Sequence, residues 1–117
     1  MRLVSRHGRL RIQMRILYLG QDLVVLISGG EAHLGAAAMG IVGHSVTTGL
    51  LLVPGHREDV LAQETADRMS KVLGFNVIVA AGIHYDNITP EEIRQIQTMV
   101  HHLTERCLAA LTGGKAC

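Results

Sequence analysis

The chain has 117 residues, of which 48% are hydrophobic and 18% charged, and its formal net charge is +1 at pH 7. This length accommodates one domain with its own core and excludes two domains of ordinary size. No apolar run approaches the roughly 18 residues of a membrane span. The chain has no Trp and one Phe, so it lacks a platform for stacking nucleic-acid bases. We therefore expect neither a membrane nor a nucleic-acid partner.

Cysteine and glycine usage adds two expectations. Cys107 falls in a helical pattern and Cys117 is the last residue, which is no disulfide framework and favours a reducing, cytoplasmic environment. The apolar excess, together with 13 Gly, indicates that surface is buried against a partner. A homodimer is the simplest such arrangement.

The N-terminal part predicts a hairpin. Residues 1–8 are expected to form a flexible leader. From Arg9 to Tyr18, apolar side chains alternate with Arg and Gln, the pattern of a half-buried strand with an exposed basic face. That face is either solvated or a surface that steers anions. A Gly-Gln-Asp turn joins this strand to an apolar one over 23–28, and the short connection predicts antiparallel pairing.

Two further strands are expected before the first helix. The run 33–42 is rich in Gly and Ala. It is compatible with a short helix, but each Gly would weaken a helix by about 1 kcal/mol, so a strand is favoured. Residues 45–53 combine Thr with a Leu run and predict a fourth strand in an inner position.

The C-terminal half predicts a helix, a strand and a second helix. A helix over 58–73 leads to a strand over 77–81, and a crossover of this length predicts a strand parallel to the fourth. Thr89 and Glu92 form a capping-box pattern for a helix over 90–111. The layout is ββββαβα: a single α+β domain over 9–112, with a mostly antiparallel five-stranded sheet and two helices on one face. Residues 113–117 are a tail.

Three histidines follow or precede the predicted elements at one sheet edge. His33, His56 and His84 stand at strand exits or helix entries, and the predicted topology opens these three loops on the same edge. The backbone N–H groups after Gly55 favour a phosphate at the helix start; a plain turn is the alternative. A metal site would use the three histidines with Glu31 or Asp86, but no closely spaced pair such as H-x-H supports it.

Other chemistry is weakly indicated. Ser28 and Ser45 lack the context of a nucleophile elbow. The glycine pairs are too short for a dinucleotide fingerprint, and there is no P-loop lysine. A mononucleotide across the loop edge is compatible with the sequence, with Tyr85 as the aromatic residue placed to flank a planar ring.

Three segments resemble the prenylated-flavin chaperone family: G-G-E-A-H-L-G-A at 29–36, V-P-G-H-R-E-D at 53–59 and A-G-I-H-Y-D-N-I-T at 81–89. The family comprises small bacterial and archaeal proteins similar to the D component of gallate and related phenolic-acid decarboxylase systems. The resemblance covers residues 9–112. Its fold is likened to that of small heterodimeric proteasome assembly chaperones, which implies an α+β domain that dimerises through its sheet.

The resemblance implies a non-enzymatic chaperone that binds prenylated FMN, or FMN, and assists its delivery into a UbiD-type decarboxylase. The expected cofactor-binding residues lie in the three segments: His33, Gly55, His56, Arg57, His84, Tyr85 and Asn87. Residues 55–57 are expected to hold the phosphate and the others to line the ring or ribityl side. No catalytic or metal-binding residue is assigned. The alternatives are a small histidine-based metal-dependent enzyme and a purely structural assembly chaperone.

Overall fold

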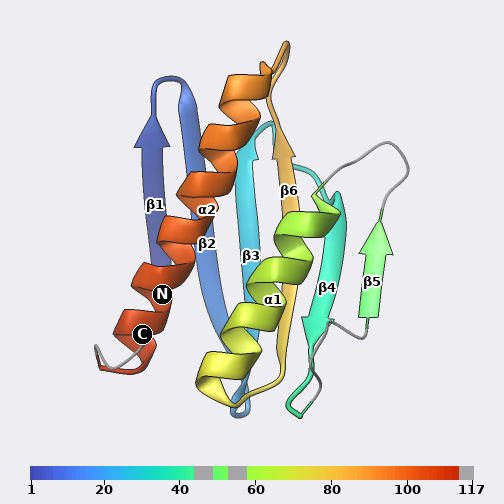
Figure 1. Ribbon diagram of the computed structural model, residues 1–117, viewed down its shortest axis with the longest axis vertical. Helices are drawn as coiled ribbons and strands as arrows, with labels where there is room; N and C mark the ends of the chain where they lie inside the picture. Colours follow the sequence, from blue (N-terminus) through green and yellow to red (C-terminus); the bar gives the residue numbers. More distant parts are fainter. Residues whose placement is uncertain (44–48, 53–57, 114–117) are drawn as a thin grey trace.

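In the described part of the chain, a six-stranded sheet forms one layer, and two helices cover one of its faces (Figure 1). The computed structural model describes residues 1–43, 49–52 and 58–113, with the backbone alone for 49–52. The elements are β1 (Arg2–His7), β2 (Leu10–Leu19), β3 (Asp22–Gly30), β4 (Ala36–Gly40), β5 (Gly49–Leu52), α1 (Asp59–Leu73), β6 (Val77–His84) and α2 (Pro90–Leu111).

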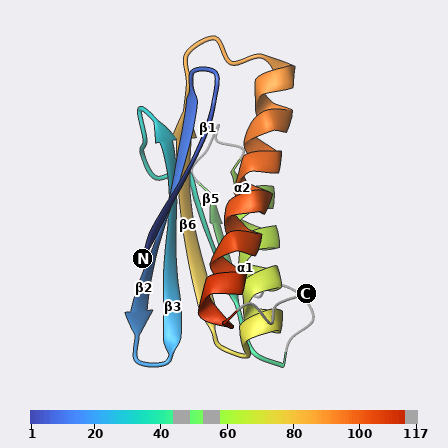
Figure 2. The same ribbon diagram turned by 90° about the vertical axis from the view of Figure 1, so that its left-hand side faces the viewer.

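The strand order in the sheet is β1-β2-β3-β6-β4-β5. The β3–β6 pair is parallel, and the other neighbours are antiparallel. The predicted α+β class, the mostly antiparallel sheet and the two helices on one face are therefore confirmed. Figure 2 shows both helices on the same side of the sheet, with the other side uncovered by any described helix.

The five predicted strands are joined by a sixth at the edge. Residues 2–7, expected within a flexible leader, form β1 and pair with β2 from Arg2↔Arg15 to His7↔Leu10. Gly8 has a φ of 58°, the positive value that a tight two-residue hairpin turn requires. The sequence pattern does not predict β1 because the strand is largely polar. An edge strand buries little apolar surface and needs no continuous apolar run.

The order of the last three strands differs from the expected one. β5 and β6 run in the same direction, as predicted, but they are not neighbours, because β4 lies between them and pairs antiparallel with both. β6 also continues to His84 rather than ending at Ala81, since its last residues pair with β3 as far as Gly30↔His84. His84 is thus the last residue of a strand rather than part of a loop.

The core lies between the sheet and the helices. α1 packs on β4 and β6, and α2 packs on β1 and β2. Side chains such as Met69 on α1, Val79 on β6 and Leu103 on α2 are fully buried, and each such burial stabilises the fold by about 1.5–3 kcal/mol. Gly40 lets β4 approach α1 closely, because a Cβ there would overlap the backbone carbonyl of Ala66.

Candidate functional site

The connection between β3 and β4 crosses the end of the sheet at which β3 and β6 stop. This connection, residues 31–35, must pass over β6 because β6 lies between the two strands that it joins. It does so at Gly82, where a Cβ would overlap the backbone carbonyl of His33. The Gly35 N–H donates to the Ala81 carbonyl at 2.9 Å. The crossing therefore fixes His33 above the end of β6.

A cavity of about 620 Å³ opens at this end of the sheet, beside the last residues of β6 and the first turns of α1 and α2. Its apolar wall comprises Val60, Leu61, Ile83, Ile88, Ile93 and Ile96, and its polar groups are His33, Glu58, Glu64, His84 and Gln97. This volume lies within the roughly 300–1,000 Å³ typical of small-molecule sites, which are likewise mainly apolar with a few polar groups.

Two of the predicted histidines meet at the cavity. The ring centroids of His33 and His84 are 5.6 Å apart, with a 50° angle between the rings. His84 Nε2 lies 3.1 Å from Asp86 Oδ1, and His33 Nδ1 lies 3.1 Å from the Glu31 carbonyl oxygen. These neighbours orient both imidazoles, so the predicted convergence of the first and third loops is confirmed.

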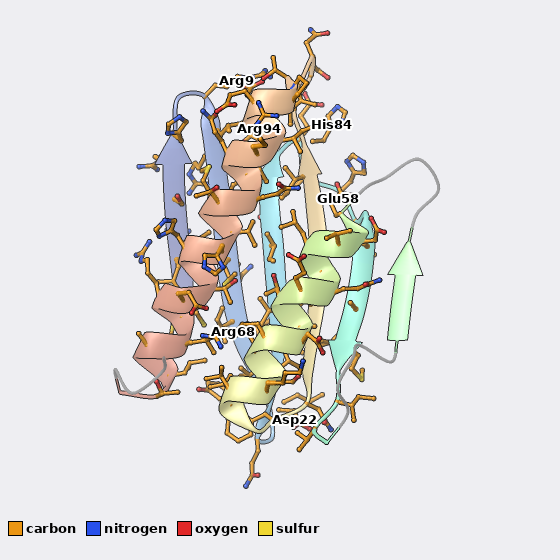
Figure 3. The ribbon with its side chains drawn as sticks, in the orientation of Figure 1. Arg9, Asp22, Glu58, Arg68, His84 and Arg94 are labelled. Atoms are coloured by element: carbon orange, nitrogen blue, oxygen red, sulfur yellow. The ribbon has the colours of Figure 1, made fainter. Side chains whose placement is uncertain are left out.

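The second of the three predicted loops cannot be placed in the same way, because Gly55, His56 and Arg57 lie outside the described residues. The residue that follows them does line the cavity: Glu58 stands at the N-cap position of α1. Figure 3 shows Glu58 and His84 at the same end of the sheet.

Glu58 is a site residue that sequence reasoning missed. Only 8% of it is exposed, and its Oε1 accepts a hydrogen bond from the Ile83 N–H at 3.3 Å. Gly35 leaves the space that the carboxylate occupies, since a Cβ there would overlap it. The sequence offered only an acid at a helix start, a pattern that ordinarily marks a solvated residue interacting with the helix dipole.

Tyr85 lies away from the cavity. Its hydroxyl accepts a hydrogen bond from the Arg11 N–H at 2.7 Å and donates one to the Arg11 carbonyl at 3.1 Å. The Arg9 guanidinium lies 5.5 Å from the Tyr85 ring centroid. Tyr85 therefore fastens β2 to the end of β6, and the structure gives it no position flanking a ligand in the cavity.

Asn87 is also absent from the cavity wall. It has a φ of 54°, a left-handed conformation that Asn tolerates better than most residues, and it turns the chain between β6 and α2. Its position explains the Asp-Asn pair as a turn before the helix cap. Of the described residues in the predicted set, the two histidines line the cavity while Tyr85 and Asn87 shape its surroundings.

The cap of α2 is confirmed in detail. Thr89 Oγ1 accepts from the Glu92 N–H at 3.1 Å, and the Thr89 N–H donates to Glu92 Oε1 at 3.1 Å. Arg9 also donates to both Glu92 oxygens, at 2.8 and 3.0 Å. The Arg9 hydrogen bond and then the Thr89 N–H lower the pKa of Glu92 from 4.5 to about 2.

This ion pair predicts a specific acid sensitivity. Because folding lowers the pKa of Glu92, its stabilising contribution is fully present above about pH 4.5 and is lost as the pH falls through about 2. Arg9→Gln should lower Tm at pH 6 and flatten the dependence of Tm on pH across that window. The control Arg94→Gln removes a guanidinium that pairs with Glu91 on the same helix. An equal flattening in both variants would contradict the assignment to Arg9.

Neither a metal cluster nor a membrane-spanning helix is found within residues 1–43, 49–52 and 58–113. No group of three or more His, Cys, Asp or Glu side chains there could hold a metal ion. The metal interpretation also required His56, which lies outside those ranges. No helix in the same ranges is long and apolar enough to cross a membrane.

The model of the prenylated flavin chaperone LpdD-like domain matches residues 6–112, which include all the described residues that line the cavity. A comparison with curated proteins finds no match.

Proposed function

The chain belongs to the prenylated flavin chaperone family, and from that premise we propose that it binds prenylated FMN, or FMN, in the cavity at the end of β6. The observation that carries the proposal is the cavity itself: about 620 Å³, with a wall of aliphatic side chains and two imidazoles at its rim. A flavin ring system is planar and largely apolar, with polar edges. The aliphatic wall suits its faces, and His33 and His84 suit its edges.

The phosphate is assigned to the segment just before α1. The cavity-lining residues among those described include no Arg or Lys, and they include Glu58 and Glu64, whose carboxylates would repel a phosphate dianion. Gly55, His56 and Arg57 precede Glu58 directly. Their side chains include one guanidinium and one imidazole, and the segment leads into the N-terminus of α1, the positive end of the helix dipole, where phosphates bind. The flavin ring would then lie farther along the wall, toward α2.

The cavity suits reversible binding and transfer of a flavin rather than catalysis. Part of its apolar wall faces solvent: Ile93 is 45% exposed and Val60 is 52% exposed. A bound flavin would therefore keep one side open for transfer. We assign the receiver as a UbiD-type decarboxylase and the location as the cytoplasm. We also assign a homodimer formed through the part of the uncovered sheet face that β3 and β6 provide, where the outward positions include the half-buried Val24, Leu26 and Ile78.

An FMN titration, followed by quenching of flavin fluorescence and by Tm, tests the binding proposal. Ile93→Gln should weaken binding about tenfold, because it removes apolar wall worth roughly 1–1.5 kcal/mol. Val42→Gln is the matched control: Val42 is 50% exposed and lies after β4, at the opposite end of the sheet. His56→Ala should abolish the Tm increase that FMN produces in the wild type.

Two results would contradict the proposal. The first is no binding of FMN or prenylated FMN by the wild type at high micromolar concentration. The second is an equal loss of affinity in Ile93→Gln and Val42→Gln. If the protein instead formed a stable complex with a decarboxylase subunit and flavin did not affect that complex, the protein would be identified as a purely structural assembly chaperone.

A further inference from the structure

The uncovered face of β1 and β2 carries four arginines in register. Arg2 stands opposite Arg15, and Arg6 stands opposite Arg11. All four are exposed, and they alternate with the residues of β2 that enter the core, such as Ile12 and Met14. We call these four residues the arginine ladder.

The pairing geometry brings the ladder's charges close together. Met1 and Ile16 exchange both backbone hydrogen bonds, Ile16 N–H to Met1 O at 2.9 Å and Met1 N to Ile16 O at 3.3 Å. Alternation along an antiparallel pair then makes Arg2–Arg15 and Arg6–Arg11 the non-hydrogen-bonded pairs, whose Cα atoms lie only about 4.5 Å apart. Like charges directly opposite one another destabilise a sheet. The fold therefore carries a repulsion that a bound anion would relieve.

No acid neutralises the ladder within the described part of the chain. The ion pairs there use other cations, namely Arg9, Arg68, Lys71, His84 and Arg94. The outward positions beside the ladder are neutral: Val4 and Gln13 separate the two pairs, and Leu26 lies across from Arg15. The ladder is thus an exposed positive surface on a chain whose net charge is only +1.

We propose that the arginine ladder is a docking surface for an acidic segment of another protein. The two guanidinium pairs lie four residues apart along each strand, about 13 Å, so an extended segment can present a carboxylate to each. Arginine binds carboxylates with two parallel hydrogen bonds where geometry permits. The neutral positions between the pairs accommodate an uncharged residue of the segment.

Other occupants fit this surface less well. A second copy of the chain that placed its own ladder here would oppose arginine to arginine, because a two-fold contact sets the same patch against itself. Nucleic acid would find no aromatic side chain on which to stack a base, since none stands at the outward positions of β1 or β2 and the Tyr85 hydroxyl is bound to Arg11. The proposal goes beyond flavin binding and does not depend on it.

A fluorescein-labelled octaglutamate peptide is a direct probe, with fluorescence anisotropy as the measurement. Wild-type protein should bind it at about 50 mM salt and much more weakly at about 300 mM, since exposed charges are screened. The double variant Arg11→Gln/Arg15→Gln should bind at least about tenfold more weakly. The control Lys71→Gln/Arg94→Gln lowers the net charge by the same amount, alters two exposed helical cations and should retain the wild-type affinity.

Stability provides a second readout. Removing one arginine from each pair relieves the repulsion, so the ladder variant should show a Tm at or above that of the wild type. Saturating peptide should raise the Tm of the wild type more than that of the variant. The proposal is overturned by absence of peptide binding to the wild type, by equal losses in the two double variants, or by a fall in Tm of the ladder variant. Tighter binding of a single-stranded oligonucleotide of equal charge would identify a nucleic-acid surface instead.

Discussion

Gly82→Ala is expected to destabilise the protein and to disorganise the cavity at the same time. A Cβ at this position would overlap the backbone carbonyl of His33, and backbone atoms cannot rotate away as a side chain can. The crossing segment 31–35 must then lift off β6, or β6 must shift. Overpacking of this kind costs roughly 1–3 kcal/mol and occasionally more. Chemical denaturation should show this loss, and FMN affinity should fall because His33 is displaced from His84.

Gly29→Ala is the matched control for this change. Gly29 lies on the neighbouring strand β3, and the closest atom to a Cβ there is Ile12 Cδ1 at 2.6 Å, the flexible end of a side chain. A small rotation of Ile12 can accommodate the added methyl group, so the free energy of unfolding should fall less than in Gly82→Ala and FMN affinity should persist. Equal losses in the two variants would show that the crossing over β6 is not the critical contact.

Local chemistry made much of this fold predictable. The Thr89–Glu92 pattern predicted the capping box, which is formed. The first helix was predicted to end at residue 73, and Gly74 just after it adopts the left-handed conformation, with a φ of 72°. The alternation over Arg9–Tyr18 correctly identified the inward and outward faces of β2. Such features depend on neighbouring residues alone, so the sequence contains them in full.

Strand order and side-chain direction were not predictable in the same way. Nothing in the composition of 36–40 required β4 to lie between β5 and β6, because strand order depends on long-range packing. The directions of Tyr85 and Glu58 depend on where β3 and β4 end. β3 ends at Gly30, and beyond this end the Tyr85 hydroxyl forms hydrogen bonds with the Arg11 backbone. β4 begins only after Gly35, and beside this start Glu58 accepts a hydrogen bond from the Ile83 N–H. Each side chain satisfies a backbone group that a longer neighbouring strand would have satisfied.

Glu58→Ala is expected to have the second large effect. Because Glu58 is buried and accepts from the Ile83 N–H, the change leaves that N–H without its acceptor on the inner face of the sheet end, at a cost of about 1–3 kcal/mol in the free energy of unfolding. It also releases the first turn of α1 from β6. The cavity wall between them should loosen, and FMN affinity should fall together with stability.

Two comparisons separate the hydrogen bond from the charge. Glu58→Gln keeps a side-chain oxygen that can accept from Ile83 N–H, so it should retain most of the stability that Glu58→Ala loses. Glu64→Ala removes the same charge from the same cavity, but this residue is exposed and has no such backbone bond among the described contacts. Its free energy of unfolding should stay close to that of the wild type, and its FMN affinity should rise or hold, since one carboxylate fewer faces the phosphate. A Glu64→Ala variant as unstable as Glu58→Ala would mean that negative charge at the rim, rather than the bond to Ile83, holds α1 on the sheet.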